Sequence, residues 1–225
     1  MLVEILPLLI LGFSLGLVHA LDADHVMAVS ALSNQKPNFI RTLSFSAHWA
    51  LGHGGVLLVS GLLLFGLGIS IPSEFQYVAE LSVGFMLIGI GLYTFWQFKE
   101  KSISVTHHVH GDIEHSHWHD KKHTDKNIEK SEHVPVMVGC LHGLAGSAPA
   151  LALIPIASQG NISTVIGYLF VFSSGVMLSM VLFGLGLGSA QKWLSTRFKR
   201  VHYWSQRFIA LASTVVGFLW LYKAI

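Results

Sequence analysis

The sequence predicts an all-α, polytopic membrane protein in which six transmembrane helices form two inverted three-helix repeats. Three observations lead to this fold class. The chain of 225 residues is 52% hydrophobic but only 12% charged, whereas soluble globular domains carry about 25% charged residues. Lysine and arginine gather in alternate connections, and short motifs recur in the same order in the two halves.

Six apolar stretches are long enough to cross a bilayer, which requires about 20 mostly apolar residues. We expect these spans at Val3–Ala28, Leu43–Ile69, Val78–Phe98, Val134–Ser158, Thr164–Ala190 and Phe208–Lys223. The predicted domains are therefore a first repeat over residues 1–98, a loop over 99–133 and a second repeat over 134–225. A signal peptide at the start is disfavoured, because no basic residue precedes the first apolar stretch.

The distribution of basic residues predicts how the chain is oriented. The first, third and fifth connections between spans carry lysine or arginine, and the second and fourth carry none. Cytoplasmic loops of membrane proteins are enriched in these residues. We therefore expect an integral protein of the plasma (inner) membrane, with both termini outside and the long connection, Lys99–His133, in the cytoplasm.

The two halves share three short motifs. These are Gly16-Leu-Val-His19 with Gly139-Cys-Leu-His142, Leu64-Phe-Gly-Leu-Gly68 with Leu182-Phe-Gly-Leu-Gly186, and, more weakly, Gly91-Leu-Tyr93 with the segment from Gly217 to Tyr222. Because each half has an odd number of spans, the second half must cross the membrane in the opposite sense. Inverted repeats are typical of transporters, whose substrate site lies near the bilayer midplane between the repeats.

Four ionisable residues fall together at the end of the first apolar stretch: His19, Asp22, Asp24 and His25. A charged side chain inside the membrane costs at least ~2.5 kcal/mol and often marks an ion pathway. On a continuous helix, which turns by about 100° per residue, His19, Asp22 and His25 share one face. Asp24 points elsewhere, and it either holds a neighbouring helix or reaches the site where the helix unwinds. Imidazole with carboxylate suits a borderline divalent ion such as Ni²⁺, Co²⁺ or Zn²⁺.

Three further histidines fall inside predicted spans. His48 and His53 lie on the second span, not on one stripe, so one can bind the metal while the other orients a carboxylate. His142 lies on the fourth span, which Pro149 and Pro155 interrupt. The simpler interpretation, a histidine that only forms hydrogen bonds between helices, stays open, above all for His142.

The long connection is rich in histidine. Its candidate weak metal ligands are His107, His108, His110, His115, His117, His119 and His123. Such tracts are usually disordered, and their local chemistry is metal binding. The loop can therefore collect metal for export or buffer it after import. A solvated spacer without a role is the alternative.

The segment from His19 to His25, His-Ala-Leu-Asp-Ala-Asp-His, resembles the HAxDADH signature of the nickel/cobalt transporter family. Leu51–Val56 is similar to the family's LGHSxV motif, and His142–Ala148 resembles the HGLAGSA segment of its short, six-helix, UreH-like branch. Two departures leave the metal and the direction of transport open: Val18 stands where the family has arginine, and the LGFDTATE motif of long members is absent.

Carried over to this chain, the resemblance implies a set of essential residues and close neighbours. The essential residues are His19, Asp24 and His25, with Asp22, His48 and His53 close by. The resemblance also implies that nickel or cobalt is the transported substrate.

The leading hypothesis is alternating-access transport of nickel and/or cobalt ions through the His/Asp site, with no organic cofactor. The membrane potential favours uptake, because a dication gains about 4.6 kcal/mol per 100 mV. Two alternatives remain. One is an intramembrane metal-dependent hydrolase, although no HExxH motif is present. The other is a non-transporting accessory protein for nickel-enzyme maturation.

Composition limits the partners and excludes other classes. A net charge of +2 predicts no nucleic-acid partner, and the single cysteine, Cys140, excludes an intrachain disulfide. The expected partners are the divalent metal ion and the lipid bilayer, with nickel-enzyme maturation proteins as candidates. We expect no catalytic residue, and therefore no enzyme.

Overall fold

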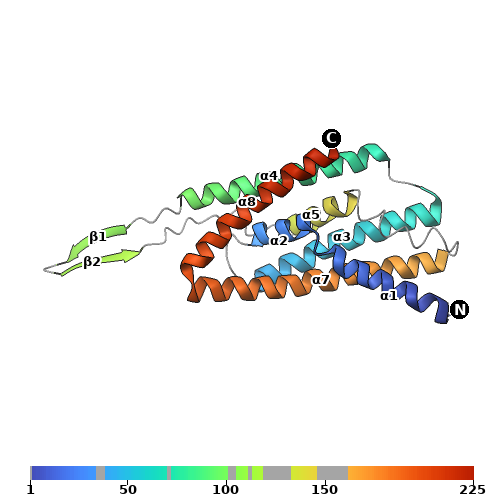
Figure 1. The fold of residues 1–225 in the computed structure, drawn as a ribbon, viewed down its shortest axis with the longest axis horizontal. Coiled ribbons are helices and arrows are strands. Elements are labelled where there is room, and N and C mark those ends of the chain that lie inside the picture. The colour runs from blue at the N-terminus through green and yellow to red at the C-terminus, as the bar shows by residue number, and fades with distance from the viewer. Residues whose placement is uncertain are drawn as a thin grey trace.

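The computed structural model describes residues 2–33, 39–69, 72–100, 105–110, 113–118, 133–145 and 162–225. Within these ranges the chain forms helices and one two-stranded hairpin (Figure 1). The helices are α1 Leu2–His19, α2 Ala23–Ser33, α3 Phe39–Leu67, α4 Ser73–Glu100, α5 His133–Leu144, α7 Ile162–Arg197 and α8 Lys199–Ala224. The strands are β1 Val105–His110 and β2 Ile113–Trp118.

The helices confirm the prediction of a multi-pass membrane protein. Among the described helices, α3, α4, α7 and α8 are long and apolar enough to cross a bilayer, and the bent pair of α1 and α2 is a fifth candidate. Helix α5 is apolar but shorter than a span. The remainder of the fourth predicted span, residues 146–158, lies outside the described residues. The described chain therefore accounts for four or five spans, not for all six that the sequence predicts.

The first span is not the continuous helix that we predicted. Helix α1 ends at His19, α2 begins at Ala23, and the two are bent by 51°. Aspartate competes with the backbone for hydrogen bonds and favours helix ends, and both Asp22 and Asp24 lie at this point. A broken helix is tolerated at membrane depth where protein or a cavity surrounds it. The burial of Ala20 and Asp24 meets that condition.

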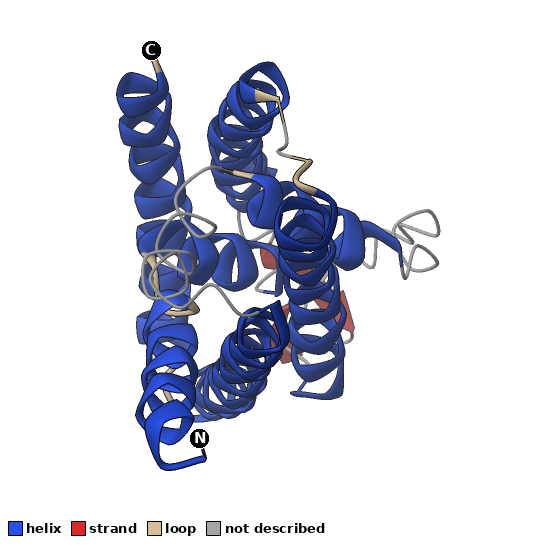
Figure 2. Ribbon diagram, turned by 90° about the vertical axis from the view of Figure 1, so that its right-hand side faces the viewer, coloured by secondary structure: helices blue, strands red, loops and turns tan. Residues whose placement is uncertain are grey.

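The helices pack in pairs that join the two halves of the chain. Helix α1 lies along α7, α5 lies along α3, and α3 and α7 also pack on each other. Helices α4 and α8 form a further pair, which α2 and α5 contact (Figure 1). Figure 2 views this bundle along its helices. The arrangement places the α1–α2 break beside α3, α5 and α7.

Glycines allow these helices to approach closely, as is typical of helix packing in membranes. A Cβ at Gly16 would collide with the carbonyl oxygen of Phe172 on α7, and a Cβ at Gly139 with that of Trp49 on α3. Two more glycines stand in the same relation to the neighbouring helix: Gly52 to Val136, and Gly175 to Phe13. The main chains of α1 and α7, and of α5 and α3, are thus in direct contact.

These contacts repeat at one sequence interval. Gly139 follows Gly16 by 123 positions, and Gly175 follows Gly52 by the same number. The residues that these glycines contact show the same interval, because Phe172 follows Trp49, and Val136 follows Phe13, by 123 positions. The interval extends further along α3 and α7, where Gly61 lies against Leu169, and Gly184 against Ser46. The predicted match between Leu64–Gly68 and Leu182–Gly186 has a different interval, so it does not mark equivalent contacts.

The hairpin projects from one end of the bundle, and both termini lie away from that end (Figure 1). The junction of α7 and α8 lies at the hairpin end, and it carries Lys192, Arg197, Lys199 and Arg200. Basic residues and the histidine-rich connection therefore share one end, as the charge pattern predicted.

The hairpin corrects the expectation of a loop without regular structure. Strands β1 and β2 pair antiparallel, with Val105 opposite Trp118 and His110 opposite Ile113. The description all-α therefore holds for the membrane-spanning elements but not for this loop. His119 and His123 lie outside the described residues, and metal binding by the loop stays a prediction.

Replacing Gly52 by alanine should destabilise the protein, because the new methyl group would collide with the main chain of α5 at Val136. Overpacking of this kind costs about 1–3 kcal/mol. Gly55, on the same helix, has nothing within 4 Å of an added Cβ, so Gly55→Ala is the matched control and should be neutral or stabilising. Thermal unfolding of both variants in detergent tests this contact; equal melting temperatures would contradict it.

Candidate metal centre

Four histidines from three parts of the chain meet at the α1–α2 break. His19 ends α1 and His25 lies in the first turn of α2, while α3 supplies His53 and α5 supplies His142. All four are buried, with exposed fractions of 6%, 2%, 0% and 2%. The ring of His25 lies 4.7 Å from that of His19, 4.9 Å from that of His53 and 5.4 Å from that of His142, between centroids.

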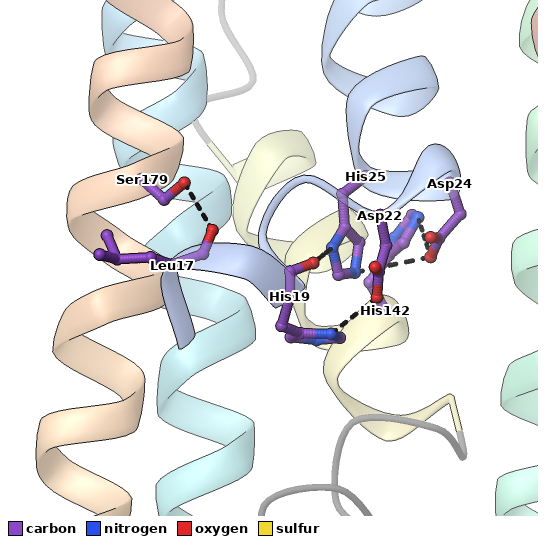
Figure 3. A network of polar contacts seen from close by, with 7 residues as sticks. All are labelled: Leu17, His19, Asp22, Asp24, His25, His142 and Ser179. Carbon is purple, nitrogen blue, oxygen red and sulfur yellow. Dashed lines mark hydrogen bonds and ion pairs between the residues drawn. The ribbon is translucent and has the colours of Figure 1, made fainter. Parts of the chain in front are cut away.

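Hydrogen bonds at Nδ1 fix the orientation of three of these rings. His25 Nδ1 donates to the carbonyl oxygen of His19 (3.0 Å) across the break, and His142 Nδ1 donates to that of Val138 (2.9 Å). His19 Nδ1 donates to the carboxylate of Asp22 at 2.8 Å (Figure 3). Because each acceptor is an oxygen, Nδ1 carries the proton in all three neutral rings, and Nε2 carries a lone pair.

The Nε2 atoms face the interior of the site without protein donors. Among the described residues, Nε2 of His19 and of His142 is buried and has no hydrogen-bond partner, and the same holds for both ring nitrogens of His53. A buried polar atom without a partner is costly, by about 1–3 kcal/mol. A histidine that binds metal through one nitrogen normally donates its other N–H to an oxygen, which is the arrangement of His19, His25 and His142.

Asp24 supplies a buried carboxylate to the same space. Its Oδ2 lies 3.5 Å from Nε2 of His25 and 3.9 Å from Nε2 of His142, and the residue is 5% exposed. An imidazole lone pair and a carboxylate oxygen are both acceptors, so they repel each other unless a cation or a proton lies between them. The site is therefore built to hold positive charge.

The spacing of the donor atoms suits a metal ion. His19, His25 and His53 each offer a nitrogen, and these atoms lie within 4.8 Å of one another; Asp22, Asp24 and His25 meet the same condition. Three ligands on one ion, each at about 2.1 Å, can all be separated from one another by at most about 3.6 Å. Side-chain movements of less than about 1 Å per residue therefore bring either group into coordination.

The structure unites six of the seven intramembrane residues that the sequence predicted. These are His19, Asp22, Asp24, His25, His53 and His142. His48 belongs to neither ligand group of the described chain. Its Nδ1 donates to the carbonyl oxygen of Ser44 one turn earlier on α3 (2.8 Å), the same kind of bond that His142 makes on α5. Asp24, which a continuous helix would turn away, reaches the site because of the break.

Two aromatic walls of the site were not predicted. The indole of Trp49 stacks on His53 with ring centroids 4.9 Å apart and planes within 9°, and Phe172 stacks on His19 at 5.9 Å. Trp49 lies four positions before His53, a spacing that brings side chains together on a helix, so that signal was present in the sequence. The sequence around Phe172 on α7 contains no signal that predicts its contact with His19.

Replacing His25 by glutamine should weaken Co²⁺ binding at equilibrium at least tenfold, since second-shell changes alone cost about 10–100-fold. His48→Gln, a change of the same kind on α3, should leave tight binding intact because His48 belongs to neither ligand group of the described residues. Isothermal titration of the purified proteins with Co²⁺ measures both. Equal affinities for His25→Gln and the wild type would exclude His25 as a ligand.

Three comparisons relate the chain to known proteins. A family model described as the cytochrome C biogenesis protein transmembrane region matches residues 9–219. The urease accessory protein UreH of Bacillus sp. (strain TB-90) is 31% identical over 225 residues, which cover 98% of this chain and 93% of that protein. No solved structure matches. The matched region runs from α1 to α8 and includes every residue of the candidate centre. The chain therefore belongs to the family of the cytochrome C biogenesis protein transmembrane region, and it is a relative of UreH.

Proposed function

We propose that this protein transports divalent transition-metal ions across the membrane, with nickel and cobalt as its principal substrates. One observation carries the proposal. At the α1–α2 break, buried imidazole nitrogens converge with their lone pairs directed into the site and without donors among the described residues. A cation is the occupant that these lone pairs and the carboxylate of Asp24 would stabilise together.

The donor set supports a borderline transition metal over a hard cation. Imidazole nitrogen suits nickel, copper, zinc and iron, whereas Mg²⁺, Ca²⁺ and Mn²⁺ prefer carboxylate, carbonyl and water oxygens. His19, His25 and His53 provide three nitrogens within 4.8 Å of one another. Asp24 adds negative charge, which reduces the cost of holding a dication in a medium of low dielectric constant.

The repeated contacts support alternating access between two three-helix units. The contact of Gly16 on α1 with Phe172 on α7 is matched by the contact of Gly139 on α5 with Trp49 on α3. This match is expected if α1, α3 and α4 form one unit and α5, α7 and α8 form its inverted copy. The centre then lies where the units meet, since His53 comes from the first and His142 from the second. Transporters built from inverted repeats bind their substrates at such an interface.

The proposed orientation places the hairpin and the basic end of the bundle in the cytoplasm, with both termini outside. Lysine and arginine are enriched on the cytoplasmic side of membrane proteins, and the α7–α8 junction and the hairpin share one end (Figure 1). In this orientation the inside-negative potential drives dications toward the histidine-rich loop, which favours uptake.

A second candidate function is that of a non-transporting accessory protein in the maturation of a nickel enzyme. The observation in its favour is the similarity to UreH, which is named a urease accessory protein. The two functions differ in what they require of the loop, because docking needs an exposed segment whereas transport needs the buried centre. Neither the family model nor UreH is described as an enzyme, so no observation favours the hydrolase alternative.

Transport is tested by measuring metal accumulation in cells that express the chain, given graded Ni²⁺, Co²⁺ or Zn²⁺. We expect higher Ni²⁺ and Co²⁺ content than in cells without the chain, and a return to background with His19→Ala, because that change removes one inward-facing nitrogen. Lower content in expressing cells would mean export. Identical content for every metal, with the chain shown in the membrane, would contradict transport.

Deleting residues 99–132 separates the two candidate functions. A transporter should keep a substantial part of its flux, because every residue of the centre lies outside the loop. An accessory protein that docks through the loop should lose its entire effect on nickel-enzyme activity. The measurements are Ni²⁺ flux into proteoliposomes and urease activity in cells, made on the same variant.

A further inference from the structure

The centre contains two ligand groups that overlap in a single residue. We call His19, His25 and His53 the inner station and Asp22, Asp24 and His25 the outer station, since each set offers ligand atoms within 4.8 Å of one another. Every residue of the inner station is buried. The outer station reaches the surface through Asp22, whose side chain is 47% exposed. His25 is common to both.

We propose that a divalent metal ion enters through the outer station and moves to the inner station while it stays bound to Nε2 of His25. This inference deepens the proposed function and rests on it, because it assumes that the centre binds such an ion. It assigns Asp22 and Asp24 to ion entry and partial dehydration, and His19 and His53 to final coordination and selectivity.

The orientation of His25 permits this role. Its Nδ1 is held by the carbonyl oxygen of His19 across the break (3.0 Å), so the ring keeps its place while the other ligands exchange. Its Nε2 lies 3.5 Å from Asp24 Oδ2, and its ring lies 4.9 Å from that of His53. An ion can therefore move from oxygen ligands to nitrogen ligands without leaving the protein.

A second observation points to a ligand at the outer station besides its acidic residues. Nε2 of His142 is fully buried, has no hydrogen-bond partner among the described residues, and is directed at Asp24 Oδ2 from 3.9 Å. Figure 3 shows Asp22, Asp24, His25 and His142 gathered on one side of the break. A cation beside Asp24 would satisfy this nitrogen as well, which an arrangement of carboxylates alone would not require.

Asp22 connects the two stations. One of its oxygens, Oδ2, accepts the hydrogen bond from His19 Nδ1, and a carboxylate has a second oxygen that can coordinate an ion. Asp22→Asn separates these tasks. Asparagine keeps a carbonyl oxygen for the His19 bond, so the inner station stays oriented, but it removes the negative charge that attracts the ion.

The test is stopped-flow binding of Co²⁺ to the full chain in detergent, with the Co²⁺ absorption spectrum as a second readout. For Asp22→Asn we expect the association rate to fall about tenfold, which is the lower end of electrostatic effects on on-rates. The affinity should fall by no more than the roughly tenfold that a changed hydrogen-bond partner of a metal-binding histidine costs, and the spectrum should stay that of the wild type, because asparagine still accepts the His19 bond. His53→Gln should instead change the spectrum and weaken the affinity.

Two outcomes for Asp22→Asn would overturn the proposal. Unchanged rates would remove Asp22 from the entry path, and a weakened affinity with an altered spectrum would mean a single site that includes Asp22.

Asp22→Glu, which restores the carboxylate, should recover faster association. Glu74→Gln removes an exposed carboxylate at the start of α4 and should match the wild type. If the asparagine variant aggregates, the wild type still decides: its association rate should fall with added salt, and a salt-independent rate would overturn entry through Asp22.

These measurements need no transport, so the two proposals can fail separately. Wild-type chain that binds Co²⁺ with the expected kinetics but carries no flux in proteoliposomes would refute the proposed function as a transporter and leave the two stations standing. Flux together with Asp22→Asn kinetics identical to those of the wild type would refute the stations alone.

Discussion

The hydrogen bond from His25 Nδ1 to the carbonyl oxygen of His19 is the interaction on which the centre depends. Breaking a helix in an apolar environment frees main-chain groups that water cannot satisfy. At this break the carbonyl oxygen of His19 accepts both the N–H of Asp22 (3.1 Å) and Nδ1–H of His25. The same bond fixes the tautomer of the neutral His25 ring, with the proton on Nδ1 and the lone pair on Nε2, 3.5 Å from Asp24 Oδ2. A single contact thus links the two sides of the break and orients a candidate metal ligand. Ser179 on α7 supports it by donating to the carbonyl oxygen of Leu17 (2.9 Å), near the end of α1.

The close glycine contacts are the second constraint, because they set the positions of the helices that surround the break. The glycine contacts are approximately symmetric between the two halves of the chain, but the candidate ligands are not. His142 stands at the position equivalent to His19, whereas Val176 and Phe172 stand at the positions equivalent to His53 and Trp49. Both halves therefore supply a scaffold of the same shape, and the first half supplies most of the chemistry.

Much of this was accessible from the sequence, because the membrane leaves few ways to satisfy a polar side chain. Apolar runs and basic connections predicted the multi-pass class, and ionisable residues within apolar runs predicted six of the residues at the centre. The break was predicted only in part. A helical wheel assumes a continuous helix, and on such a helix Asp24 lies on a different face from His19 and His25. His48 and His142 each bond to the carbonyl oxygen one turn earlier on their own helix, yet His142 lies 3.9 Å from Asp24 and His48 belongs to neither ligand group of the described residues. The sequence does not distinguish the two, because the difference depends on where the neighbouring helices pack. The hairpin in the loop was missed because composition alone predicted disorder.

For the proposed metal site, the aromatic rings supply a physical basis for selectivity. Trp49 and Phe172 cover His53 and His19 and are themselves buried, and apolar rings offer no ligand to an ion. An ion such as Mg²⁺, which dehydrates reluctantly and demands oxygen ligands, would lose its hydration there and gain only nitrogens. A borderline ion would recover that cost through imidazole coordination. On the proposed mechanism we therefore expect selectivity to arise at the inner station, while the exposed carboxylate of Asp22 attracts cations without distinguishing among them.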